Sequence, residues 1–201
     1  MPLTTILTLT GIMAVVNLLV PSFTQNPTAG WGMAAASSSL LFMAPYALVG
    51  WLVGPFAGRL APQLGYRRML QLGLATSLLV LVALATVGLS SPWLLGILVF
   101  VLGISYAGVT NVMLNGLGIV LSPKSAPGLL PGLNGASFGI GAGLSFTILG
   151  NAVTEGSPVG SASASGYVSA LWIAGAILAV TLLVTLALPK PQTPAEDAPA
   201  A

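Results

Sequence analysis

The sequence predicts an all-α membrane protein that forms a bundle of six transmembrane helices. Only five basic and three acidic residues occur among its 201 residues, and 56% of the residues are hydrophobic. A soluble domain carries about a quarter charged residues, so lipid is the natural solvent for this chain. The charges also leave long gaps before Arg59, between Arg68 and Lys124, and between Glu155 and Lys190. Each gap accommodates at least one apolar span of roughly 20 residues, the length that crosses a bilayer.

Proline and polar clusters end the first three predicted spans. Residues 4–22 form the first span, which stops near Pro21 before a polar loop at residues 25–30. Residues 35–58 form the second span, whose internal prolines predict kinks, because neighbouring helices must satisfy the freed carbonyl groups. Residues 69–89 form the third span, and a Ser-Ser-Pro sequence ends it.

Similar breakers separate the last three predicted spans. Residues 93–121 form the fourth span, before a loop rich in Pro, Ser and Gly. Residues 129–152 form the fifth span, and a Gly- and Ser-rich loop leads to the sixth at residues 167–188. Residues 1–188 are therefore predicted to form the bundle. The tail, residues 189–201, is rich in Pro and Ala and is predicted to be a disordered cytoplasmic segment.

The positions of the basic residues predict the orientation in the cell membrane. Six spans put both termini on one side, and cytoplasmic loops carry the excess of Lys and Arg. With the N-terminus inside, all five basic residues are cytoplasmic, and these are Arg59, Arg67, Arg68, Lys124 and Lys190. The three loops on the other side contain no Lys or Arg. The chain is thus predicted to be a multi-pass protein with both termini in the cytoplasm.

The polar residues exclude most enzymatic chemistry. The sequence has no cysteine and no histidine, which removes thiolate chemistry and the commonest general base and metal ligand. The acids Glu155, Glu196 and Asp197 all fall outside the predicted spans. A net charge of +2 that rests on a few residues gives no sign of nucleic-acid binding. We therefore expect no enzyme, no metal and no cofactor.

One segment, residues 54–68, carries the most specific motif and reads GPFAGRLAPQLGYRR. It resembles the motif that joins the second and third helices of each six-helix half in the major facilitator superfamily, roughly Gly-x-Leu-Ala-Asp-Arg-x-Gly-Arg-Arg. The matching residues are Gly58, Leu60, Ala61, Gly65, Arg67 and Arg68. Pro62 stands where the family has Asp and Gln63 where it has Arg, so this loop lacks the Asp that a charge relay would use.

The motif has a physical interpretation as a tight connection between two packed helices. Gly58 and Gly65 permit a sharp turn. Arg59, Arg67 and Arg68 can bind carbonyl groups at a helix C-terminus or acidic lipid headgroups at the cytoplasmic face.

Two further segments resemble the C-terminal half of the drug:proton antiporter branch of the superfamily. They are Pro21-Ser22-Phe23-Thr24-Gln25 and the stretch from Asn134-Gly135 to the glycines at residues 139–143. The resemblance implies a fold corresponding to one half of a major facilitator protein. It also implies a transporter that exports small amphipathic or drug-like molecules.

The family's full proteins hold two six-helix halves around a central cavity, whereas this chain resembles one half. We expect a gene fragment, a truncated product, or a subunit that pairs with an N-terminal six-helix half or with a second copy. The alternative is a non-transporting relic or a regulatory or binding subunit. A small channel is a further alternative, although the sequence has no charged ring or carbonyl-filter motif.

Neutral polar residues within the spans are the candidates for a substrate cavity. Asn111 and Asn115 lie one helical turn apart on the same face, and Tyr106 and Thr110 form an adjacent stripe. Together they can line an aqueous cavity, and Asn17 and Asn134 are similar candidates. The alternative is that these groups bond to neighbouring helices.

Small residues on the fifth span predict close helix packing. Gly135, Gly139 and Gly143 recur every four residues, a spacing that lets two helices approach closely. The functional alternative is a face that slides during alternating access.

Overall fold

The computed structural model describes residues 1–188, and in that range the chain is a bundle of six long helices without strands. The spanning helices are Pro2–Gln25, Ala35–Leu64, Tyr66–Thr86, Pro92–Val120, Leu129–Gly156 and Ser165–Thr185. Lipid offers the backbone no hydrogen-bond partner, so helices that bond their own peptide groups are the expected solution. The predicted all-α fold is confirmed.

Three of the spanning helices contain a π-helical segment with one extra residue per turn. The first consists of α1 (Pro2–Ala14), η1 (Val15–Leu19) and α2 (Val20–Gln25), and the second of α3 (Ala35–Ser38), η2 (Ser39–Met43) and α4 (Ala44–Leu64). The fourth consists of α6 (Pro92–Leu102), η4 (Gly103–Thr110) and α7 (Asn111–Val120). The third, fifth and sixth are α5 (Tyr66–Thr86), α8 (Leu129–Gly156) and α9 (Ser165–Thr185), and the 3-10 turn η3 (Gly88–Ser90) precedes α6. Such π segments occur frequently at functional sites.

Several helix boundaries differ from the sequence prediction, most of all the ends of the second and fifth spanning helices. The second spanning helix continues to Leu64, six residues beyond the predicted end, and Gly65 alone connects it to α5. Gly65 has φ +88°, a conformation that other residues rarely adopt, so it ends the helix where Pro62 does not. Glu155 lies in the last turn of α8 rather than in the following loop. The predicted tail, with Lys190, lies outside the described residues.

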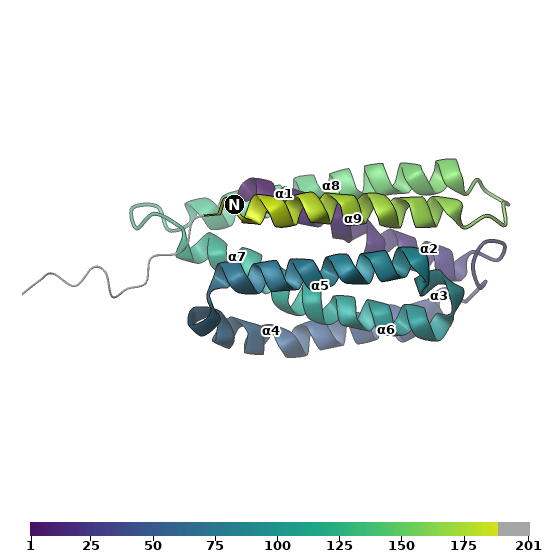
Figure 1. Cartoon of the computed structure of the whole chain (residues 1–201), viewed down its shortest axis with the longest axis horizontal. Helices are drawn as coiled ribbons and strands as arrows, with labels where there is room; N and C mark the ends of the chain where they lie inside the picture. The colour runs from purple at the N-terminus through teal and green to yellow at the C-terminus, as the bar shows by residue number, and fades with distance from the viewer. Residues whose placement is uncertain (189–201) are drawn as a thin grey trace, which may run out of the picture.

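The helices form two groups of three, which are stacked one above the other in Figure 1. The first, fifth and sixth spanning helices pack on one another through α1, α8 and α9. The second, third and fourth pack on one another, with η4 against both α4 and α5. The two groups meet along α5 and α9 and where α7 packs on α8. We call the region between α1, α7 and α8 the seam.

Glycines allow two of the closest helix crossings. A Cβ at Gly141 of α8 would lie 2.6 Å from the main-chain oxygen of Ile6 and 2.7 Å from the Leu9 Cβ. A Cβ at Gly103 of η4 would lie 2.6 Å from the main-chain oxygen of Tyr46. Side chains at these positions would push the helices apart, so both crossings depend on the missing Cβ.

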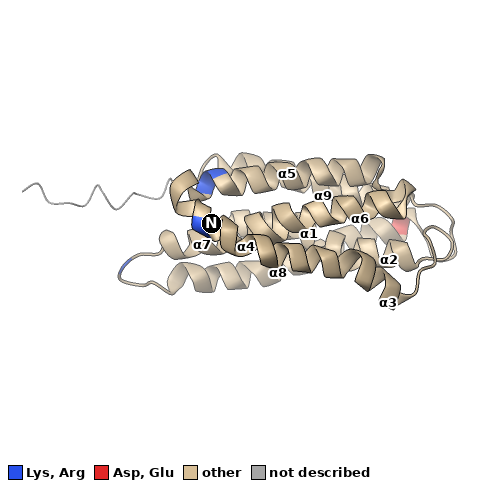
Figure 2. Cartoon of the chain, turned by 90° about the horizontal axis from the view of Figure 1, so that it is seen from below, with Lys and Arg blue, Asp and Glu red and all other residues tan. Residues whose placement is uncertain are grey.

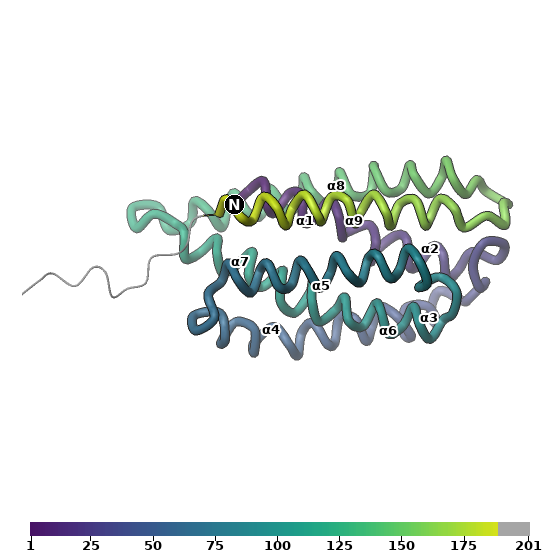
Figure 3. The backbone as a smooth tube through the Cα atoms, viewed as in Figure 1, coloured from purple at the N-terminus to yellow at the C-terminus, as the bar shows by residue number. Residues whose placement is uncertain are grey.

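The charged residues lie at opposite ends of the bundle. Figure 2 shows the described basic residues at one end and the acidic residue Glu155 at the other. The basic residues are Arg59, Arg67, Arg68 and Lys124, and we call their end the basic end. The N-terminus and the end of α9 lie at this same end (Figure 3). The described basic residues thus share one end of the bundle, and the predicted orientation places that end in the cytoplasm.

Candidate functional site

The polar residues of the fourth spanning helix contribute to the seam near the basic end. Asn111 opens α7 directly after the π segment η4, and Asn115 follows one turn later. Asn115 is exposed and Asn111 is half-buried. The face that α7 leaves open therefore carries two carboxamide groups in an otherwise apolar helix.

Hydrogen bonds join these two asparagines to the first and fifth spanning helices. Asn134 of α8, which is buried, donates from its Nδ2 to the Asn115 Oδ1 at 3.2 Å. Asn115 donates from its Nδ2 to the Asn111 main-chain oxygen at 2.9 Å and to the Asn111 Oδ1 at 3.3 Å. The Thr5 hydroxyl of α1 donates to the Asn134 Oδ1. We call Thr5, Asn134, Asn115 and Asn111 the amide relay.

The structure buries the two other polar candidates of the fourth spanning helix. Thr110 is fully buried, and its hydroxyl donates to the Ser105 main-chain oxygen at 2.8 Å. This bond spans five residues, as the π-helical backbone of η4 allows. Tyr106 is also buried, with its hydroxyl 3.9 Å from the Met13 Sδ. Neither side chain lines an open cavity here, so the alternative of bonding within the bundle describes them better.

Asn17 is a further candidate polar residue and lies on the first spanning helix, outside the amide relay. It lies in η1 and is exposed, and its Nδ2 donates to the Met13 main-chain oxygen at 2.9 Å. The Met13 sulfur lies 3.9 Å from both the Asn17 Nδ2 and the Tyr106 hydroxyl oxygen. Two of the predicted candidates thus meet at one methionine, two turns along α1 from Thr5.

Sequence reasoning missed Thr5, which anchors the amide relay. The available signal was four threonines in the first ten residues, an unusual density of hydroxyl groups for a lipid-facing helix. All four are buried, at positions 4, 5, 8 and 10. Within residues 1–188, every buried side-chain nitrogen or oxygen has a hydrogen-bond partner. The threonines therefore belong to the interior of the bundle rather than to its lipid surface.

The predicted packing glycines of α8 do not face another helix among residues 1–188. A Cβ at Gly135, Gly139 or Gly143 would have no atom of the described chain within 4 Å. Gly141, which lies beside them, does pack and points the other way, toward α1. Close helix packing through these three exposed glycines, or a face that slides during alternating access, stays a prediction.

The motif at residues 58–68 is mostly helical, and one of its arginines has a defined partner. Arg67 donates from Nη1 to the Leu188 main-chain oxygen at 2.8 Å and from Nη2 to the Leu186 oxygen at 2.6 Å. These carbonyls follow the end of α9, where a cation complements the helix dipole. Arg59 and Arg68 are exposed. Arg67 therefore has one of the two roles expected for the arginines, which is to bind carbonyl groups at a helix end.

Replacing Arg67 with alanine is expected to lower the free energy of unfolding by about 1–2 kcal/mol, because two charge-assisted hydrogen bonds are lost at a partly exposed site. The melting temperature, followed by tryptophan fluorescence of the purified chain, measures this. Arg68→Ala is the matched control, since that neighbouring side chain is exposed and has no described hydrogen bond. Equal losses in the two variants would contradict the role of Arg67.

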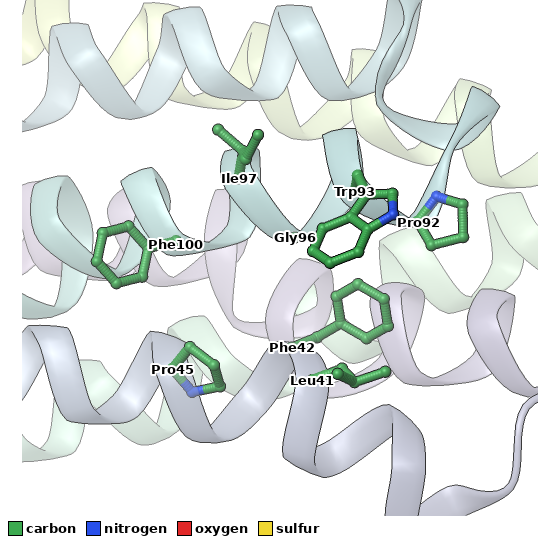
Figure 4. Close-up of a pocket in the computed structure, with 8 residues that line it drawn as sticks. All are labelled: Leu41, Phe42, Pro45, Pro92, Trp93, Gly96, Ile97 and Phe100. Carbon is green, nitrogen blue, oxygen red and sulfur yellow. The ribbon is translucent and has the colours of Figure 1, made fainter.

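An apolar groove of about 430 Å³ lies on another part of the surface (Figure 4). One wall is formed by η2 and α4, and the other wall is formed by α6. Its lining residues are Leu41, Phe42, Pro45, Pro92, Trp93, Gly96, Ile97 and Phe100. Only the Trp93 indole among these side chains offers a hydrogen bond, and Trp93 is 84% exposed. A groove of this chemistry suits hydrocarbon rather than a polar solute.

The described residues of the seam offer hydrogen-bonding groups that can bind a solute. No group of three His, Cys, Asp or Glu side chains that could hold a metal ion occurs among residues 1–188. The seam carries neutral carboxamide and hydroxyl groups, which can hold a neutral polar molecule by hydrogen bonds. Such groups in an apolar bundle fit a membrane protein that binds a neutral polar solute.

Comparison with known proteins identifies the family of this chain. The chain belongs to the Major Facilitator Superfamily, whose family model matches residues 1–146. The motif at residues 58–68 identified the family correctly.

One curated relative is the uridine/deoxyuridine transporter of Lactococcus lactis subsp. cremoris (strain MG1363), which is 46% identical over 168 residues. The match covers 83% of this chain and 35% of the relative, so the chain spans about a third of the relative's length. The substrate in this name is a nucleoside. Neither comparison supports the drug:proton antiporter branch, multidrug efflux or a drug-like substrate.

Proposed function

We propose that this chain forms one six-helix half of a transporter for pyrimidine nucleosides and that the seam contributes to its substrate pathway. The observation that carries the proposal is the amide relay, which brings carboxamides of α7 and α8 together on an open face. Nucleosides are neutral molecules rich in hydrogen-bonding groups, which such a face suits. The similarity to a uridine/deoxyuridine transporter supports the same substrate class.

The pathway would be completed by a second six-helix bundle, either an N-terminal half or a second copy of this chain. The second and fifth spanning helices support this part of the proposal. In their most apolar stretches 22% of the residues are buried, against 67% in the first helix. They flank α7 and expose faces that another bundle can cover. The basic end would lie in the cytoplasm, as the positive-inside rule expects.

The proposed role of this chain is substrate binding without proton transfer. A proton-coupled transporter usually carries an ionisable residue within the membrane. The sequence has no histidine, and its acids are Glu155, Glu196 and Asp197, of which Glu155 lies in the last turn of α8. Any group that couples transport to protons would then belong to the second bundle.

Binding of tritiated uridine to the purified chain in lipid nanodiscs tests the proposal. Saturable binding that unlabelled uridine displaces and sucrose does not is the expected result. A folded chain that binds no nucleoside would contradict it. That result would favour the alternative of a non-transporting relic or regulatory subunit, for which the replacement of the motif's Asp by Pro62 is the specific observation.

A further inference from the structure

The amide relay has a direction, and main-chain chemistry fixes it. A carboxamide can be turned over so that its nitrogen and oxygen exchange places, which coordinates alone seldom distinguish. The Asn111 main-chain oxygen, however, can only accept a hydrogen bond. Because it lies 2.9 Å from the Asn115 amide, the atom of Asn115 that faces it must be Nδ2.

The orientation of Asn115 in turn fixes the orientation of the other groups in the relay. With Nδ2 of Asn115 facing Asn111, its Oδ1 faces Asn134 and can only accept. Asn134 must then present Nδ2 to Asn115 and Oδ1 to Thr5, whose hydroxyl donates. Thr5 and Asn134 are both buried, so water does not compete for these bonds. The relay therefore runs in one sense, with each group donating to the next toward the open face.

Asn111 is the last member of the relay, and neither N–H group of its carboxamide has an acceptor among the described residues. Its Oδ1 accepts from the Asn115 Nδ2 at 3.3 Å, so its own Nδ2 lies on the other side of the amide. Within residues 1–188 no acceptor takes the two N–H groups of this Nδ2, and the side chain is half-buried. The open end of the relay thus offers hydrogen-bond donors, while every amide oxygen of the relay already has a donor.

We infer that Asn111 selects a carbonyl oxygen of the substrate and that the rest of the relay positions it to do so. The ligand class is a pyrimidine nucleoside whose base carries two carbonyl groups, as uracil does. A uracil base presents an acceptor on either side of its ring N–H. Cytosine has an amino group in place of one carbonyl, and that group would direct its own N–H toward Asn111. The assignment rests on the proposed nucleoside function.

Competition between uridine and cytidine tests the assignment, because the two nucleosides differ only at one edge of the base. Binding of tritiated uridine to the full chain in nanodiscs is measured with each nucleoside as competitor. Uridine would gain one hydrogen bond from Asn111, whereas cytidine would place its own donor against the Asn111 donor. This difference predicts about tenfold tighter binding of uridine than of cytidine. Asn111→Ala is expected to reduce this ratio to about one, and Asn111→Asp, which replaces donors with acceptors, is expected to reverse it.

Asn151→Ala is the matched control, since Asn151 is an exposed asparagine of α8 outside the relay, and the ratio should stay at its wild-type value. Thermal unfolding followed by tryptophan fluorescence establishes that each variant is folded. If Asn111→Asp does not fold, the ratio measured for Asn111→Ala tests the assignment. Equal binding of uridine and cytidine to the wild-type chain, or an unchanged ratio in Asn111→Ala, would overturn the assignment alone. Absence of any nucleoside binding to the folded wild-type chain would overturn the proposed function and this assignment with it.

Discussion

Replacing Gly141 with alanine is expected to destabilise the bundle by about 3 kcal/mol, which lowers the melting temperature by roughly 6–12 °C. The added Cβ would lie 2.6 Å from the Ile6 main-chain oxygen and 2.7 Å from the Leu9 Cβ. Backbone atoms cannot turn aside as a side-chain end can, so α1 and α8 must separate. Since α1 is the most buried spanning helix, this movement would disturb the packing of its whole group.

Gly139→Ala on the same helix is the matched control and is expected to act in the opposite direction. No described atom lies within 4 Å of the Cβ that it would add. Alanine favours an α-helix over glycine by about 1 kcal/mol, so this variant should be slightly more stable than the wild type. Thermal unfolding of the purified chain in detergent compares the two. Similar destabilisation by both substitutions would show that α8 does not pack on α1 through Gly141.

Replacing Asn134 with leucine is expected to weaken uridine binding about tenfold and to cost about 1 kcal/mol of stability. Leucine has a similar volume but leaves the buried Thr5 hydroxyl without its acceptor and the Asn115 Oδ1 without its donor. Hydrogen bonds between membrane helices average about 0.6 kcal/mol, which keeps the stability cost small. The larger effect falls on binding, because Asn115 no longer holds Asn111 in place.

A double variant separates these two effects of Asn134. Replacing both partners of a buried hydrogen bond with apolar groups is close to neutral, so Thr5→Val added to Asn134→Leu should restore the melting temperature. It should not restore uridine affinity, since Asn115 stays unsupported. Recovery of both quantities together would mean that Asn134 matters only for folding. Melting curves and tritiated-uridine titrations on the same preparations provide the measurement.

The number of spanning helices follows from the sequence, because each helix that crosses lipid needs a charge-free apolar stretch of about 20 residues. Charge-free stretches of sufficient length can be counted without knowing any tertiary contact. The end of the second helix is different. Pro62 was expected to lie beyond the helix, yet α4 continues through it to Leu64. A proline tolerated inside a helix depends on its neighbours, which the sequence does not show.

The candidate site was predictable in part. The spacing of Asn111 and Asn115 places them on one helix face, and the structure has them hydrogen-bonded to each other. Thr5 and Asn134 are 129 residues apart, so only the fold brings them together. Thr110 is buried at the end of the π-helical segment η4, where its hydroxyl bonds to the main-chain oxygen five residues earlier.

The glycine pattern shows a related limit. Gly139 and Gly141 are two residues apart and therefore point in nearly opposite directions on α8. Which of the two faces meets a neighbour is decided by the position of α1, not by the spacing of the glycines. The sequence identified a helix with a small-residue face but could not assign the face that packs within this chain.

Uridine uptake by a chimera tests the central proposal most directly. In the chimera, this chain replaces the segment that it matches in the Lactococcus lactis uridine/deoxyuridine transporter, which supplies the remainder of the pathway. Cells that lack their own nucleoside uptake and express the chimera are predicted to accumulate tritiated uridine in a saturable manner. Uptake should fall about tenfold at low uridine concentration when the chimera carries Asn134→Leu. A chimera that reaches the membrane, melts as a folded protein and accumulates no uridine would contradict the account.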